Sequence, residues 1–165
     1  MVEIRFAVQE EINEISSLVA TGWRNAYRSL FSEKFLAQIN DNHWTRTLSS
    51  GLSKKEAFPV VMLENGALIG VMVIYKTKEE SCAELSSCYL LPEKIGTGYG
   101  HALHTWVEGE TKKMGFTKCT CNVFEGNDRA ARFIEAHGFA LNGKTAKIKL
   151  GDEFHCLFTY EKSLL

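Results

Sequence analysis

Three glycines at alternating positions, Gly96, Gly98 and Gly100, are the residues of this chain whose type and spacing best suit the binding of an anion. The run before them is rich in β-forming residues and ends at Pro92, and the run after them repeats apolar residues at helical spacing until Gly115. A glycine loop between a strand and a helix exposes backbone N–H groups at the positive end of the helix, and the missing Cβ lets a ligand approach closely. The pattern predicts a phosphate-binding loop, although a glycine-rich connection that binds nothing has the same signature.

The spacing of this loop excludes two common phosphate sites. The loop does not end in the Gly-Lys-Ser/Thr that a Walker loop needs. The dinucleotide fingerprint needs a third glycine three residues after the second and an early βαβ unit, whereas this loop lies past the middle of the chain and has Gly100 two residues after Gly98. We therefore expect a phosphate-bearing ligand other than a nicotinamide dinucleotide or a triphosphate on a Walker loop.

Periodicity and turn residues predict the elements that position the loop. Asn65-Gly66 between two apolar runs predicts a β-hairpin, and a cap at Asn127 or Asp128 with a stop at Gly138 predicts a helix. We expect strands at residues 2–8, 58–63, 68–75, 85–91 and 116–123, two short strands within 148–160, and helices at 10–30, 32–39, around 44–48, at 99–114 and at 127–138. This order predicts an α+β fold with a mixed sheet.

Size and charge limit the classes of function. The chain has 165 residues, 45% of them hydrophobic, which predicts one domain with ample core, and its formal net charge of −1 argues against nucleic-acid or anionic-membrane partners. No stretch approaches the ~18 apolar residues of a membrane span. The first six residues lack the pattern of a signal sequence, so we expect a cytoplasmic protein.

The five cysteines, an odd number, fit a reducing compartment. Cys119 and Cys121 would point to one face of a strand, and a Cys-x-Cys pair without companions is a weak zinc signal. We expect reduced cysteines that act as small buried apolar groups. No Asp/Glu-x-His spacing suggests a metal, and none is expected.

Two separated motifs resemble the GCN5-related N-acetyltransferase (GNAT) family. The first runs from Glu84 through the glycine loop to Leu103, and it matches the family loop Gln/Arg-x-x-Gly-x-Gly/Ala at Gly98 and Gly100. The second runs from Asn127 to Phe139 and resembles the family's spacing of Asn-x-x-Ala, Phe-Tyr and Gly-Phe. The element order extends the resemblance to nearly the whole chain. It implies a single GNAT domain over residues 1–165, with a mixed central sheet flanked by helices.

The resemblance implies that acetyl-CoA is the cosubstrate, held by the strand, the glycine loop and the second motif. The residues that it implies for this contact are Tyr89, Leu90, Lys94, Ile95, Gly96, Thr97, Gly98, Tyr99, Gly100, His101, Asn127, Arg129 and Arg132. Ile95 stands where the family usually has Gln or Arg, so backbone N–H groups would replace one side-chain contact with the pyrophosphate. Asn127 can also be a plain helix cap, and Arg129 and Arg132 can be ordinary solvent-facing arginines.

The implied reaction is acetyl transfer to a primary amine by direct attack. An alkylammonium has a pKa near ~10.4, so a proton must leave before the amine can attack. Glu84 is the expected base, and an exposed strand-edge charge is the alternative. A backbone N–H of Tyr89 or Leu90 would polarise the thioester carbonyl. Ile134 stands where the family commonly has the tyrosine that protonates the thiolate, which leaves three options: an unprotonated thiolate leaves, Tyr160 or Tyr89 donates the proton, or the protein binds CoA with little turnover.

The acceptor is the least determined part of this interpretation. Trp23 and Tyr27 match a Trp-x-x-x-Tyr pattern of one branch of the family, and they either line an acceptor pocket or pack in the core. We expect a small-molecule or peptide amine as acceptor, and the resemblance leaves a homodimer open. A nucleotide-dependent enzyme with another cofactor is a third hypothesis, against which the spacing of the glycine loop counts.

Overall fold

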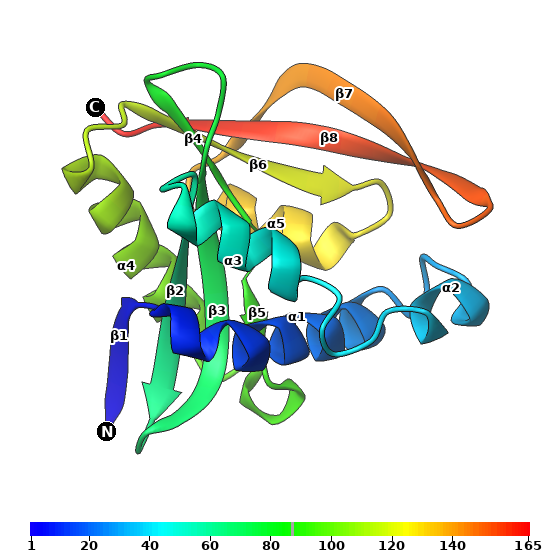
Figure 1. Cartoon of the computed structure of the whole chain (residues 1–165). Helices are drawn as coiled ribbons and strands as arrows, with labels where there is room; N and C mark the ends of the chain where they lie inside the picture. Colours follow the sequence, from blue (N-terminus) through cyan, green and yellow to red (C-terminus); the bar gives the residue numbers. More distant parts are fainter. Residues whose placement is uncertain (87) are drawn as a thin grey trace.

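The computed structural model describes residues 1–86 and 88–165, and their strands form one mixed sheet in the order β1-β2-β3-β4-β6-β8-β7, with β5 paired to β3 (Figure 1). The strands are β1 (Val2–Phe6), β2 (Ala57–Glu64), β3 (Ala67–Lys76), β4 (Cys82–Leu85), β5 (Tyr89–Leu90), β6 (Lys118–Phe124), β7 (Ala140–Leu150) and β8 (Glu153–Ser163). Among these strands β4 and β6 pair in parallel, and the other pairs are antiparallel. The α+β fold with a mixed sheet and flanking helices is confirmed.

Helices cover both faces of the sheet (Figure 1). They are α1 (Ile12–Ala26), α2 (Glu33–Ala37), α3 (Thr45–Ser53), α4 (Tyr99–Lys113) and α5 (Asp128–Ala136), with short 3-10 turns at Gln9–Glu11 and Pro92–Lys94. Alternate residues of β2 separate the two cores: Val61 packs with α1 and α3, whereas Val60 packs with α4 and α5. The sheet thus carries α4 and α5 on the same face, which brings the glycine loop close to the second motif.

Local sequence accounts for several of these boundaries. Asn65 and Gly66 both have positive φ, 51° and 84°, as a tight two-residue hairpin turn requires. The Ser32 side chain accepts a hydrogen bond from the Phe35 N–H at the start of α2, and Asn127 accepts one from the Ala130 N–H at the start of α5. The expected helix ends at Gly115 and Gly138 are confirmed, since both glycines have positive φ just after α4 and α5.

Two expectations about strands are corrected by the structure. The single strand expected at residues 85–91 is divided: β4 ends at Leu85, and β5 begins at Tyr89. The two strands expected to be short within 148–160 are long, because β7 and β8 have 11 residues each and pair along a hairpin around Gly151-Asp152. Ser87 was part of the expected strand and lies outside the described residues.

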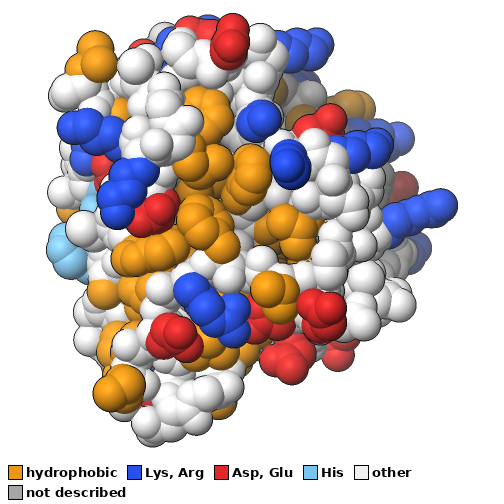
Figure 2. Space-filling model, turned by 60° about the vertical axis from the view of Figure 1, so that its left-hand side comes forward, with side chains coloured by type: hydrophobic (Ala, Val, Ile, Leu, Met, Phe, Trp, Pro, Cys, Tyr) orange, Lys and Arg blue, Asp and Glu red, His pale blue; other side chains and the backbone are white. Residues whose placement is uncertain are grey.

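Charge is mixed on the surface. Figure 2 shows lysine and arginine side chains interspersed with aspartate and glutamate around a band of hydrophobic side chains. No helix within the described residues is long and apolar enough to cross a membrane. The face in view therefore offers a ligand no broad field of one sign, in keeping with the net charge of −1.

Candidate functional site

The division between β4 and β5 opens the middle of the sheet. β4 pairs with β6 at Cys82↔Lys118, Ala83↔Cys119 and Glu84↔Thr120, but β5 pairs with β3. Between them, the Val73 N–H donates to the Ser86 hydroxyl oxygen at 2.7 Å, and the Ser86 N–H donates to the Val73 carbonyl at 3.0 Å. This local irregularity turns the chain away from β6, as β-bulges do, and leaves room between β5 and β6.

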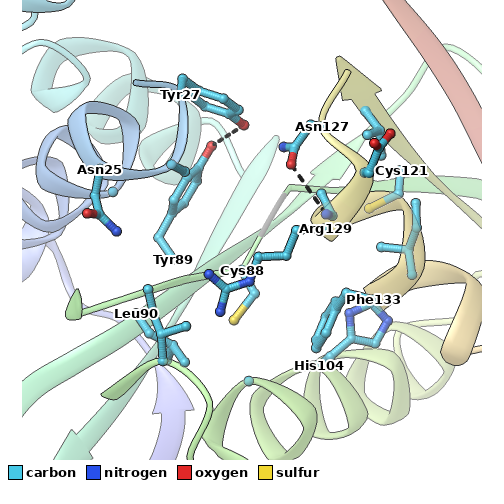
Figure 3. Close-up of a pocket in the computed structure, with 18 of the residues that line it drawn as sticks. Asn25, Tyr27, Cys88, Tyr89, Leu90, His104, Cys121, Asn127, Arg129 and Phe133 are labelled. Carbon is cyan, nitrogen blue, oxygen red and sulfur yellow. Dashed lines mark hydrogen bonds between the residues drawn. The ribbon is translucent and has the colours of Figure 1, made fainter. Parts of the chain in front are cut away.

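A cavity of about 590 Å³ occupies this opening. It is lined by the C-terminal half of α1, by β5, by the glycine loop and the first turns of α4, by β6 and by the first turns of α5. Figure 3 shows side chains from these elements converging on one space, with Tyr27 and Tyr89 on one side and Asn127, Cys121 and Phe133 on the other. A volume of this size is typical of a small-molecule site.

The glycine loop meets the cavity with open backbone. Gly96 and Gly98 have φ of 81° and 88°, and a Cβ built on either glycine would have no atom within 4 Å. These glycines are therefore needed for their backbone conformation and not for tight packing. Gly98 is the N-cap of α4 and provides no side-chain cap, so the first N–H groups of α4 are left for an anion.

The second motif contributes the opposite wall. The Asn127 Oδ1 accepts the Ala130 N–H at 3.3 Å, and its Nδ2 makes no hydrogen bond within the described residues. Arg129 is exposed, and Figure 3 shows its side chain extending across the cavity toward Cys88. Asn127 is thus a helix cap that still has an amide donor available, and Arg129 brings a positive charge to the cavity.

The structure brings together most of the residues that the sequence predicts for the site. Those that line the cavity are Tyr27, Tyr89, Leu90, Ile95, Gly96, Gly98, Gly100, His101, Asn127 and Arg129. Those that do not line it are Trp23, Glu84, Lys94, Thr97, Tyr99, Arg132 and Tyr160.

Three of the residues outside the cavity have partners in the structure that account for their positions. The Glu64 carboxylate at the end of β2 accepts hydrogen bonds from both Lys94 Nζ and the Tyr99 hydroxyl. The Tyr99 hydroxyl lies 2.6 Å from Glu64 Oε2. The Thr97 hydroxyl donates to the Lys94 carbonyl. These contacts fix the outer side of the loop, so Lys94, Thr97 and Tyr99 hold the glycines in place. Arg132 is exposed on α5.

Trp23 lies in an aromatic cluster beside the cavity. Its ring stacks on Phe31 at 5.7 Å and meets Tyr27 edge-on at 4.7 Å and Phe124 at 5.9 Å. Tyr27 is 3% exposed, and its hydroxyl lies 3.5 Å from that of Tyr89. Trp23 therefore packs among aromatic side chains and does not line the cavity, whereas Tyr27 packs in the same cluster and also lines the cavity.

The two residues expected to carry protons lie at different places. Tyr160, on β8, donates to Glu135 Oε1 at 3.2 Å, and burial together with this contact raises the pKa of its hydroxyl. Glu84 is half-buried on β4. Its neighbours Ala83 and Leu85 pack toward α4 and α5, and because successive side chains of a strand point to opposite faces, the Glu84 side chain lies on the other face of the sheet. Burial raises the pKa of Glu84, which makes its carboxylate a stronger base than an exposed one.

Several lining residues were not predicted from the sequence. Asn25 comes from α1 and Ser29 from the turn that follows it, Cys88 and Cys121 bring two thiols, and His104 comes from the second turn of α4. Burial raises the pKa of the Cys88 thiol to about 12, so this cysteine stays protonated at neutral pH. The helical spacing of His104 after Gly100 and His101 was a usable signal, since residues three and four apart share a helix face.

One further match to a phosphate-binding pattern lies outside the glycine loop. Gly138, Gly143, Lys144 and Thr145 have the Gly-x-x-x-x-Gly-Lys-Thr spacing of a Walker loop. The structure places residues 143–145 within β7, whose next element is the strand β8. A Walker loop requires a strand followed by a helix, so this match has no phosphate-binding geometry.

Comparison with known proteins adds to this geometry. The family model described as Acetyltransferase (GNAT) family matches residues 18–139. Uncharacterized N-acetyltransferases of Mycobacterium bovis and Mycobacterium tuberculosis are 33% identical over 87 residues, which is 53% of this chain and 54% of theirs. The chain thus spans about half the length of the curated relatives it matches.

Solved structures share the fold. The PaiA N-acetyltransferase from Thermoplasma acidophilum, solved in complex with coenzyme A, superposes with a TM-score of 0.81 at 22% identity and 99% coverage of both chains. The yncA protein from Salmonella typhimurium, solved with its cofactor acetyl-CoA, has a TM-score of 0.75 at 16% identity, with 99% of this chain and 94% of that chain covered.

Proposed function

Because the chain belongs to the GNAT acetyltransferase family, we propose that it is an N-acetyltransferase that moves an acetyl group from acetyl-CoA to a primary amine by direct attack. One observation carries the proposal. The glycine loop, the uncapped start of α4, β5 and Asn127 meet around a single cavity, and two neighbours of the same fold are solved with CoA or acetyl-CoA.

The residues present fit a phosphate-bearing cosubstrate. Open space over Gly96 and Gly98 leaves the N–H groups of the loop accessible, and Arg129 adds a positive charge at the same wall. These groups would hold the pyrophosphate, and the free Nδ2 of Asn127 would donate to a carbonyl of the pantetheine arm. Bound acetyl-CoA supplies an activated thioester carbonyl for attack by the amine.

Glu84 is the proposed base. It does not line the cavity, so it would take the amine proton through water, and Ser86, two residues further along the chain, lines the cavity. Its raised pKa moves the carboxylate toward the useful range for general-base catalysis.

Protonation of the departing thiolate has no dedicated donor where the family has its tyrosine. Ile134 lines the cavity and cannot donate a proton. Tyr160 is engaged with Glu135 outside the cavity, which favours Tyr89 over Tyr160 as a substitute donor. A thiolate, whose conjugate thiol has a pKa near ~8.5, can also leave unprotonated.

The lack of a proton donor at Ile134 favours a second candidate function, a module that binds acetyl-CoA or CoA with little turnover. Thiol release with a panel of small amines and peptide N-termini distinguishes the two, with thermal stabilisation by acetyl-CoA measured in parallel. Amine-dependent thiol release supports the enzyme, and stabilisation without release supports the module. If acetyl-CoA neither binds nor stabilises the chain, both are refuted. A Glu84→Gln variant that keeps the full rate across the pH range would remove Glu84 as the base.

A further inference from the structure

Three histidines and one glutamate gather between α4 and the end of α5. His104 and Glu108 are one helical turn apart on α4, and His137 is the C-cap of α5. The ring centroids of His104 and His137 are 4.2 Å apart, and those of His101 and His137 are 4.8 Å apart. His101 Nδ1 also lies 3.3 Å from His137 Nε2, at hydrogen-bond distance.

The buried member of the cluster is not satisfied by its neighbours. His104 is 1% exposed, and its Nε2 lies 3.0 Å from Glu108 Oε2 but has no hydrogen-bond geometry with any group in the described part of the chain. A buried polar atom without a hydrogen bond is costly. A cation between the imidazole and the carboxylate would satisfy both groups.

The carboxylate is already positioned for a single bond. Lys162, on β8, lies 2.7 Å from Glu108 Oε1 and also donates to the His137 carbonyl at 2.6 Å. One oxygen of Glu108 is thus held, and Oε2 is left facing His104. Contacts of this kind orient the ligands of metal sites from the second coordination shell.

The distances suit a first-row transition ion. One ligand atom from each of His104, Glu108 and His137 lies within 4.8 Å of the other two. Tetrahedral bonds of about 2.0–2.1 Å place ligand atoms roughly 3.4 Å apart, and His104 Nε2 and Glu108 Oε2, 3.0 Å apart, are close to that spacing. To complete the set, the half-buried His137 ring would turn and exchange its contact with His101 Nδ1, which lies 3.3 Å from His137 Nε2, for a bond to the ion. Two imidazoles and one carboxylate are a zinc donor set that leaves a fourth position open.

We propose that His104, Glu108 and His137 form a binding site for one divalent transition-metal ion, with Zn²⁺ the ion that best suits them. The sequence alone does not suggest the site, because His137 is 29 residues beyond Glu108 and only the packing of α4 on α5 brings them together. The site joins α4 to the end of α5, and both helices line the cavity. His104 is a ligand of the proposed site and also lines the cavity. Metal binding therefore stabilises the wall of the cavity whether or not acetyl transfer occurs.

Calorimetry on the untagged, chelator-treated chain tests the proposal with ZnCl₂ as the probe. We expect saturable binding of one ion per chain and a rise in the unfolding temperature. His104→Gln and Glu108→Gln should each weaken binding at least ~100-fold, more than loss of a typical outer-shell partner. His43→Gln is the matched control, since His43 is exposed beside Trp44 and distant in sequence from the cluster, and it should bind as the wild type does.

A second probe guards against variants that fail to fold. Co²⁺ bound to the wild type should give the visible absorption of a tetrahedral or five-coordinate ion, and His137→Gln, at a half-buried position, should abolish that absorption while its far-ultraviolet circular dichroism stays native. Absence of saturable Zn²⁺ binding would overturn the proposal. Equal Zn²⁺ affinity in the wild type and the folded His137→Gln variant would overturn it as well.

Discussion

Asn127 has two separable tasks in the structure, and two substitutions can distinguish them. Its Oδ1 caps α5 by accepting the Ala130 N–H, and its Nδ2 is the proposed donor to the bound cosubstrate. Asn127→Ala removes both groups. Asn127→Ser keeps a capping oxygen but has no amide, because serine caps helices about as well as asparagine.

The size of each effect follows from these contacts. Loss of the cap costs about 1 kcal/mol, which lowers the unfolding temperature by about 2–4 °C in a chain of this size. Loss of one hydrogen bond to the ligand costs about 0.5–1.5 kcal/mol, which weakens CoA binding about 2- to 13-fold. Asn127→Ala should show both losses, and Asn127→Ser should show only the weaker binding.

Calorimetric titration with CoA and thermal unfolding without ligand measure the two quantities separately. If Asn127→Ser binds CoA as tightly as the wild type, the amide has no role in binding and Asn127 is a cap alone. If Asn127→Ala unfolds at the wild-type temperature, the cap interpretation fails instead.

Three further predictions concern the loop, the base and the missing donor. Gly98→Ala should destabilise the chain by about 1–2 kcal/mol, because the φ of Gly98 is 88° and alanine is strained there. Gly109→Ala, at an exposed interior position of α4, should stabilise the chain by about 0.5–1 kcal/mol. Equal urea midpoints for the two variants would contradict this prediction. Burial raises the folded-state pKa of Glu84 above the ordinary 4.5, so ionisation of Glu84 opposes folding, and the wild type should lose stability relative to Glu84→Gln as pH rises through the raised pKa. Urea unfolding from acid to neutral pH measures this difference, and a variant no more stable than the wild type at neutral pH would argue against it. Ile134→Tyr should raise the rate of thiol release if the thiolate lacks a donor, at the cost of about 1–3 kcal/mol of overpacking; an unchanged rate in a folded variant would mean that protonation does not limit turnover.

The sequence predicts those parts of the fold that depend on local residue types. The turn at Asn65-Gly66 and the caps at Ser32 and Asn127 were predictable, because a few adjacent residues determine each. The division of the strand before the loop was not, because it depends on a contact between the Ser86 hydroxyl and the Val73 N–H, which is 13 residues away. Apolar residues continue across that break, so periodicity alone predicts one strand.

The same distinction holds in the site. The glycine loop and Asn127 were predictable from spacing and line the cavity. Lys94 and Tyr99 were expected at the ligand, but their side chains meet Glu64, a residue at least 30 positions earlier in the chain. The position of His137 beside His104 likewise depends on helix packing. Long-range side-chain partners are therefore what sequence reasoning missed here.

The short pairing of β4 with β6 also governs how the molecule opens. Within the described residues, strands β1 to β5 and strands β6 to β8 are joined across the sheet through three register pairs, whereas β6 and β8 share seven. The two halves should therefore behave as separate cooperative units in native-state hydrogen exchange, with the amides at the junction exchanging by a low-energy opening that leaves each half folded. A ligand seated between β5 and β6 would bind both halves and slow that opening, so exchange at the junction would report occupancy of the cavity without any measurement of catalysis.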